Sequence, residues 1–258
     1  MTSYHGRTVL VTGASLGIGE AIARQLARDG AHVLLSARSE GRLNALADEF
    51  RSRGGEATVI AHDLGTPGAA QALFDKVTAA GHEVDVLVNN AGFGKLGAFL
   101  DYEAGVYESM VTLNVTNLVA LTRLFLPAMI ERGTGGVLNV ASTAAFQPVP
   151  HFAVYAASKA FVLSFTEALH AEVAGTGVAV TALCPGPTST GFFDAADMDG
   201  APGGRPAETP EKVARVGLEA LLKNERSTVS GALNSVMAFA TRFVPKKVIL
   251  EVGKRMMQ

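Results

Sequence analysis

The segment Thr12-Gly13-Ala14-Ser15-Leu16-Gly17-Ile18-Gly19 decides the fold class of the chain. It joins a β-branched pattern typical of a strand, Arg7–Thr12, to a helical pattern over Gly17–Asp29. Glycines at these spacings permit a tight turn, bring the backbone close to a pyrophosphate and pack the helix on the strand. The helix N-terminus attracts that anion because it presents unpaired N–H groups and a positive dipole end. The pattern therefore predicts a dinucleotide-binding loop at residues 13 and 15–19 rather than an ordinary glycine-rich turn.

The same alternation of strand and helix patterns continues along the chain. Repeated strand–helix–strand units stack into a parallel sheet covered by helices on both faces. The 258 residues are 48% apolar and 18% charged, which is enough to bury a large core and excludes a disordered or fibrous protein. We expect one doubly wound α/β domain over residues 1–258, with about seven strands. The further strands expected are His32–Ala37, Ala57–His62, Val84–Asn89, Gly136–Ala141, Val178–Cys184 and Ser227–Ser230, and the later helices Ala69–Ala80, Ala104–Arg132, Ala153–Ala174 and Glu208–Leu222.

Composition also excludes several classes of partner. The formal net charge of −2 provides no global field that recruits nucleic acid. Cys184 is the only cysteine, which excludes an intrachain disulfide and a thiolate-rich metal site, so we expect no metal. Residues 1–6 are polar and lead into a strand, and no run of about 18 apolar residues occurs. These features predict a cytoplasmic protein.

Two segments differ from the rest. Residues 185–206 contain four of the ten prolines, and large apolar side chains favour a substrate lid over a solvated surface loop. Residues 231–258 form an expected C-terminal helical tail, interrupted by Pro245. From Arg242 onward this tail has five basic residues and one acidic residue. A basic amphipathic helix of this kind contacts an anionic membrane, covers the substrate entrance, or packs on its own or a sister subunit.

The end of the second strand indicates the cofactor. Sites for NAD place an acid here to bind the ribose 2′-hydroxyl. This chain has Ser36-Ala37-Arg38 instead, with no acid to repel a phosphate and a guanidinium to pair with one. The alternative is that Arg38 is a solvated surface charge. We expect NADP(H), with NAD(H) as the alternative.

A second set of residues carries catalytic potential. Tyr155 and Lys159 are four residues apart on a predicted helix, so they share a face. Ser142 ends the fifth strand, at the carboxyl edge where doubly wound sheets bind ligands, and Asn114 lies in the preceding long helix. Each residue alone has a structural explanation, but together they form a convergent polar set beside a nucleotide fold.

At this point residues 5–230 resemble the short-chain dehydrogenase/reductase (SDR) family, which has a Rossmann fold. The glycine loop, Asn89-Asn90-Ala91-Gly92 after the fourth strand, and Ser142 thirteen residues before the Tyr155–Lys159 pair carry the resemblance. It implies that Tyr155 is the general acid/base and that Lys159 binds the nicotinamide ribose and lowers the tyrosine pKa. It further implies that Ser142 orients the substrate oxygen and Asn114 positions a water. The implied dinucleotide contacts, besides the loop, Arg38, Tyr155 and Lys159, are Asp63, Leu64, Asn90, Ala91, Gly92, Pro185, Gly186, Thr188 and Thr190.

The resemblance implies reversible interconversion of a carbonyl and a secondary alcohol, with NADPH favouring reduction. Apolar side chains near the expected site indicate a lipophilic small-molecule substrate. The lack of a cluster of Lys or Arg there argues against a phosphorylated substrate. The alternatives are a non-catalytic dinucleotide sensor or scaffold, and an epimerase of nucleotide sugars. Family members commonly form homodimers or homotetramers. The expected substrate residues are Phe93, Phe146, Pro148, Val149, Phe152, Phe192, Phe193 and Met198. His151 has two interpretations: a partly exposed residue at the start of a helix, or a residue that faces the site.

Overall fold

The computed structural model describes residues 1–192, 196 and 207–256, and the expected substrate residues Phe193 and Met198 lie outside this part. Seven parallel strands form one sheet in the order β3-β2-β1-β4-β5-β6-β7, which confirms the doubly wound fold. The order reverses between β1 and β4, and ligands of such sheets bind at this switch point. The strands are β1 Thr8–Thr12, β2 His32–Ser36, β3 Glu56–Val59, β4 Val86–Asn89, β5 Gly135–Val140, β6 Val178–Cys184 and β7 Ser227–Val229.

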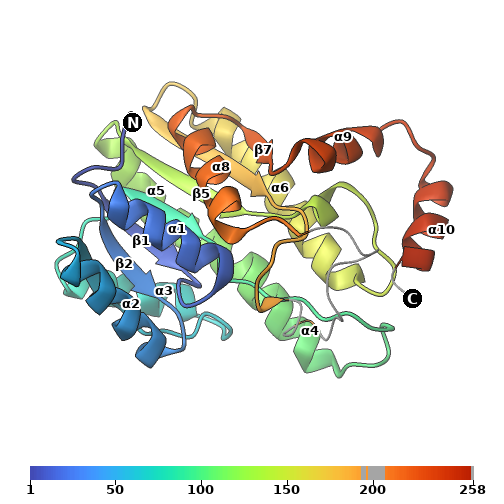
Figure 1. Cartoon of the computed structure of the whole chain (residues 1–258), viewed down its shortest axis with the longest axis horizontal. Helices are drawn as coiled ribbons and strands as arrows, with labels where there is room; N and C mark the ends of the chain where they lie inside the picture. The colour runs from blue at the N-terminus through green and yellow to red at the C-terminus, as the bar shows by residue number, and fades with distance from the viewer. Residues whose placement is uncertain (193–195, 197–206, 257–258) are drawn as a thin grey trace.

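Both faces of the sheet are covered by helices because its strands are apolar on both sides. Successive residues of β1 alternate between two buried clusters, with Val9 and Val11 in one and Leu10 in the other. The first cluster includes side chains of α1 (Gly17–Arg28), α2 (Glu40–Ser52) and α8 (Pro210–Leu222), and Figure 1 shows α1 close to α8. The second includes side chains of α3 (Ala69–Ala79) and α5 (Asn117–Glu131), and α6 (Ala153–Glu172) packs on β6.

The long helix expected over 104–132 has three parts. α4 (Ala104–Val111) leads into a π-helical turn, η1 (Thr112–Thr116), and then into α5. By length and composition alone, residues 104–131 are apolar enough to cross a membrane. Its α5 part instead buries Leu121, Phe125 and Met129 against the sheet, as a core helix does. The π turn contains Asn114, in keeping with the tendency of such turns to occur at functional sites.

Individual hydrogen bonds are found at the end of β3 and at the start of α8. β3 was expected to reach His62 but ends at Val59, although the His62 amide still donates to Ala37 O on the neighbouring segment. Thr209 caps α8, because its hydroxyl accepts from the Lys212 amide at 3.3 Å. Beyond β7, the chain forms α9 (Ala232–Ala240) and α10 (Lys246–Met256), which extend away from the sheet in Figure 1. Residues 232–254 are called the C-terminal arm below.

Candidate active site

A cavity of about 430 Å³ opens at the carboxyl ends of the strands. It brings together the end of the glycine loop, the segments after β4, β5 and β6, and one face of the C-terminal arm. This is the position that the strand-order switch predicts for a ligand. Predicted residues that line it are Leu16, Gly17, Ile18, Arg38, Asn90, Gly92, Phe93, Ser142, Val149, Phe152, Tyr155, Lys159, Pro185, Gly186, Thr188, Thr190 and Phe192.

The glycine loop is built so that no side chain fits at its three glycines. Gly13 has a φ of +66°, and a Cβ there would lie 2.8 Å from Asn90 Nδ2. Gly17 has a φ of +56°, and its Cβ would lie 2.8 Å from Thr190 Cγ2. At Gly19 a Cβ would collide with the Gly13 carbonyl oxygen. Asn90 secures the loop by donating from Nδ2 to Thr12 O at 2.9 Å and to Gly13 O at 3.2 Å.

The surroundings of the loop fit a dinucleotide. α1 begins at Gly17, and no side chain caps its first turn. The backbone N–H groups of the first turn of α1 therefore have no side-chain partner. Together with the positive end of the helix dipole, they suit a pyrophosphate. Arg38 is exposed on the cavity wall and forms no ion pair within the described residues, so its charge is available to a ligand. Leu16 also lines the cavity and supplies no second charge there.

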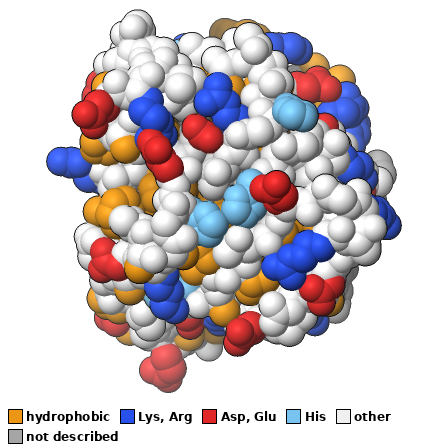
Figure 2. Space-filling view, turned by 90° about the vertical axis from the view of Figure 1, so that its left-hand side faces the viewer, with side chains coloured by type: hydrophobic (Ala, Val, Ile, Leu, Met, Phe, Trp, Pro, Cys, Tyr) orange, Lys and Arg blue, Asp and Glu red, His pale blue; other side chains and the backbone are white. Residues whose placement is uncertain are grey.

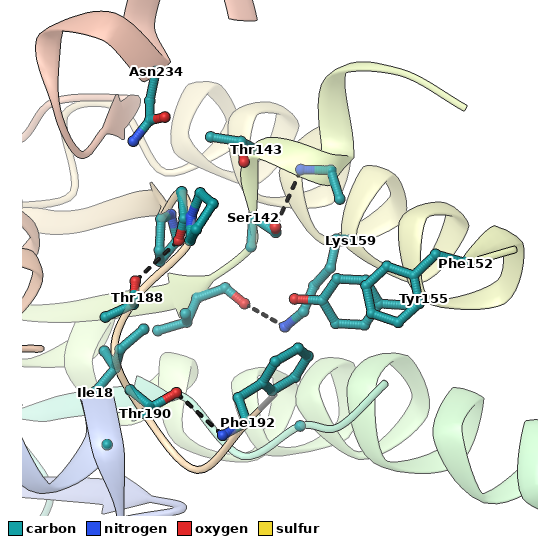
Figure 3. A pocket seen from close by; sticks show the side chains of 18 of the residues that line it. Ile18, Ser142, Thr143, Phe152, Tyr155, Lys159, Thr188, Thr190, Phe192 and Asn234 are labelled. Atoms are coloured by element: carbon teal, nitrogen blue, oxygen red, sulfur yellow. Dashed lines mark hydrogen bonds between the residues drawn. The ribbon is translucent and has the colours of Figure 1, made fainter. Parts of the chain in front are cut away.

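The structure places Ser142, Tyr155 and Lys159 in one space, as Figure 3 shows. Ser142 follows β5, and its Oγ accepts from the Ala144 amide at 3.1 Å, which fixes the side chain. Lys159 Nζ lies 5.8 Å from the centre of the Tyr155 ring and donates to Val140 O at 2.8 Å. The three side chains are thus a hydroxyl, a phenol and an ammonium group facing a single ligand volume.

Aromatic packing buries the phenol. The Tyr155 ring stacks on Phe152 with centroids 4.3 Å apart, and Phe192 lies 5.4 Å away on a tilted plane. Gly94 completes this contact, because a Cβ there would lie 2.9 Å from Tyr155 Cδ2. Sequence reasoning did not identify Gly94, and no signal other than its place after the Gly92 motif indicated it.

Burial governs the protonation states of the phenol and of the ammonium group. Burial raises the pKa of Tyr155 to about 12, and its hydrogen bond with Ser142 only partly opposes this. Burial also lowers the pKa of Lys159 to about 8. Both directions follow from loss of hydration, and the predicted lowering of the tyrosine pKa by Lys159 stays a prediction. At neutral pH the phenol is therefore protonated.

Asn114 does not line the cavity. Its side chain is buried, with Oδ1 accepting from the Phe93 amide at 3.1 Å and Nδ2 donating to Phe93 O at 2.9 Å. Nδ2 also donates to Ser158 Oγ at 3.1 Å. These hydrogen bonds fix the backbone of the segment after β4. The predicted contact of Asn114 with a water stays a prediction.

Other predicted residues lie outside the cavity lining. Asp63 is exposed, and its Oδ1 accepts from the Gly65 amide at 2.8 Å. Leu64 is buried in the core. Phe146 packs against a cluster of buried core residues, and His151 has a left-handed backbone with a φ of +62°. The predicted residues not found among the lining residues are Gly13, Ser15, Gly19, Asp63, Leu64, Ala91, Asn114, Phe146, Pro148 and His151.

The C-terminal arm adds lining residues that sequence reasoning missed. Asn234, Met237, Ala238 and Thr241 recur at the spacing of one helix face. Gly253 of α10 completes this side of the cavity. Figure 3 shows Asn234 on the same side of the pocket as Thr188, where a Cβ at Gly186 would collide with the Asn234 amide. Their spacing indicates a shared helix face, but nothing in the sequence shows that this face meets the cavity.

The chain matches the short chain dehydrogenase family over residues 7–199, and it belongs to this family. It is 35% identical over 254 residues to the ketoacyl reductase HetN of Nostoc sp., covering 98% of this chain and 86% of that protein. The chain is therefore an oxidoreductase of the SDR family with a nucleotide-binding Rossmann fold.

Two solved structures show what similar proteins bind. A short-chain dehydrogenase from Sphingobium yanoikuyae in complex with NADPH is 29% identical, with a TM-score of 0.82 over 93% of this chain and 97% of its own. One from Burkholderia phymatum in complex with NAD is 26% identical, with a TM-score of 0.82 over 93% and 94%. The shared fold thus accommodates either nicotinamide dinucleotide.

Proposed function

We propose that this protein is an NADP(H)-dependent oxidoreductase that interconverts a carbonyl and a secondary alcohol on a lipophilic small molecule. The observation that carries the proposal is the meeting of Ser142, Tyr155 and Lys159 in a cavity that also reaches the glycine loop. The similar Nostoc protein, a ketoacyl reductase by name, supports a carbonyl substrate.

The protein's own residues divide the work of a reduction. The dinucleotide, when bound, supplies the hydride. Tyr155 donates its proton to the substrate oxygen, and its high pKa keeps the phenol in the donating form at neutral pH. Ser142 donates a hydrogen bond that orients the same oxygen. Lys159 contributes positive charge beside the phenol, which favours the phenolate as it forms.

The cofactor preference rests on Arg38. A guanidinium pairs with a phosphate through two parallel hydrogen bonds. Arg38 lines the cavity with the first residues of α1, and no described acid forms an ion pair with it. The 2′-phosphate of NADP(H) is the group that this charge suits. Gly17, Ile18, Thr188 and Thr190 are placed to hold the remainder of the dinucleotide.

The substrate end of the cavity is apolar. Phe93, Val149, Phe152 and Phe192 line it from the sheet side and Met237 from the arm. No basic residue besides Lys159 and Arg38 lines the cavity within the described residues, which disfavours phosphorylated substrates.

We also propose a homo-oligomer, because Phe161 is 45% exposed on α6 and stacks with Phe165 as an apolar surface pair.

The proposal is tested by following NADPH absorbance over a panel of apolar ketones, aldehydes and ketoacyl thioesters. We expect depletion with apolar carbonyls, slower depletion with NADH, and none with sugar phosphates. A protein that binds NADPH but oxidises it with no member of the panel would contradict the proposal and favour a sensor role.

A further inference from the structure

Helix α9 presents two different faces. One face lines the cavity through Asn234, Met237 and Ala238. The opposite face carries Leu233, Val236 and Phe239, which are 65%, 65% and 58% exposed. A helix packed on a protein body normally turns polar residues to solvent. These three residues, called the outer face of α9, are therefore large apolar side chains that this chain leaves uncovered.

The apolar surface continues along the arm. Phe243 is 74% exposed, and Val248, Leu250 and Val252 of α10 are about half exposed. Among the arm residues from 232 to 254, only Ala238 is buried. Large exposed apolar side chains that gather in one part of a chain mark an interaction site rather than ordinary surface scatter.

A second exposed apolar segment lies close to α10. Gly253 approaches the Pro150 ring, with its Cβ position 3.1 Å from Pro150 Cδ. The next residue, His151, accepts the Gly97 amide at 2.9 Å. Two residues further along that loop, Phe99 and Leu100 are 62% and 90% exposed. The arm and the loop after β4 therefore belong to one end of the molecule, the right-hand end of Figure 1.

The charges of the arm are of one sign. Arg242, Lys246, Lys247 and Lys254 accompany a single acid, Glu251. None of these four bases forms an ion pair with another described residue, whereas body residues such as Arg24 and Arg132 pair with glutamates. Figure 2 shows the opposite end of the molecule, where basic and acidic side chains are interspersed. The arm thus offers uncompensated positive charge next to exposed apolar side chains.

We propose that the C-terminal arm docks on an anionic lipid surface, with the outer face of α9 inserted among the headgroups. Apolar side chains flanked by lysine and arginine are the composition that binds an interface containing acidic lipids. A second copy of the chain fits less well, because a two-fold contact through the arm would bring two sets of unpaired bases together. The docking surface borders the cavity, because α9 serves both.

The test is flotation of the full-length protein with vesicles in a density gradient. Vesicles of phosphatidylcholine alone are compared with vesicles containing phosphatidylglycerol, at low and high salt. We expect at least a tenfold larger floating fraction with phosphatidylglycerol, and a decrease at high salt because charge contributes to binding. A protein that stays at the bottom of the gradient with every vesicle would overturn the proposal.

Variants separate the arm from the rest of the surface. Leu233→Ser/Val236→Ser/Phe239→Ser and Lys246→Glu/Lys247→Glu are each expected to lose flotation at least tenfold. The matched controls, Val111→Ser/Ile130→Ser and Arg42→Glu/Lys223→Glu, change exposed residues elsewhere and should float like the wild type. Circular dichroism and NADPH oxidation check that each variant is folded. Arm variants that float normally, or that only convert a dimer to a monomer in size-exclusion chromatography, would overturn the proposal.

Discussion

The cavity has an inner wall formed by α6 and the segments that follow the strands, and an outer wall formed by the C-terminal arm. The two walls are built differently. Inner-wall groups such as Tyr155 and Lys159 are buried and held by packing and hydrogen bonds. The arm has one buried residue, Ala238, and a back surface of exposed apolar side chains. Rigid placement suits groups that transfer protons, because small displacements of such groups are costly. The arm has few contacts with the core, which suits it to bind different substrates or an external surface.

The strongest test of the inner wall is the lysine. We expect Lys159→Met to lower the rate of carbonyl reduction about 100-fold or more, because it removes a positioned charge from the reacting groups. The pKa of Lys159 is about 8, so the wild-type rate should fall as pH rises above that value and the ammonium group is lost. Rates measured from pH 6 to 10 check both effects. Equal rates and equal pH profiles in the two proteins would exclude this role.

The same variant tests burial of the charge through stability. Because the folded pKa of Lys159 is below its unfolded value of 10.5, the cost of burying the cation is fully present below pH 8 and disappears as pH rises toward 10.5. Relative to the wild type, Lys159→Met should therefore be most stable below pH 8. Urea unfolding at pH 7 and pH 10 measures the difference. A difference that does not change with pH would show that Lys159 is not buried as a cation.

A packing substitution contrasts the sheet with the arm. Leu87 of β4 is fully buried, so Leu87→Ala should reduce the free energy of unfolding by about 2–5 kcal/mol. Chemical denaturation monitored by circular dichroism measures it. A decrease of less than about 1 kcal/mol in the free energy of unfolding would mean that the core around Leu87 is packed less tightly in solution than in the structure.

The cofactor-binding side is tested by one charge. Arg38→Asp should weaken NADPH binding about 10- to 100-fold, the effect expected for a charge-assisted hydrogen bond, and leave NADH binding unchanged or improved. Fluorescence titration with both dinucleotides measures this, and Arg42→Asp, at an exposed position of α2 outside the cavity, is the control. Retention of the NADPH preference would refute the role of Arg38.

The smallest effect is expected on the outer wall. Leu233→Ala should change the free energy of unfolding by less than about 0.5 kcal/mol, because the side chain is 65% exposed. The same denaturation experiment used for Leu87→Ala provides the comparison. A large loss here would show that the outer face of α9 is covered in solution by another copy.

The inner wall was largely predictable from sequence, and the outer wall was not. Glycine spacing and the Tyr155–Lys159 interval are local patterns, so they predicted the loop and the shared helix face. The packing of Phe152 and Phe192 around the Tyr155 ring could not be predicted, because it depends on how the fold brings separate segments together. Asn234 reaches the cavity from a helix beyond the last strand, and no local pattern gives that docking.

The central claim is that Tyr155 supplies the proton inside a dinucleotide-binding cavity. The most direct measurement compares wild type and Tyr155→Phe for NADPH affinity and for the rate of reduction of the best carbonyl substrate. The expected result is unchanged affinity with a rate about 100- to 10,000-fold lower, because only the hydroxyl is removed. Equal rates in the two proteins would contradict the claim.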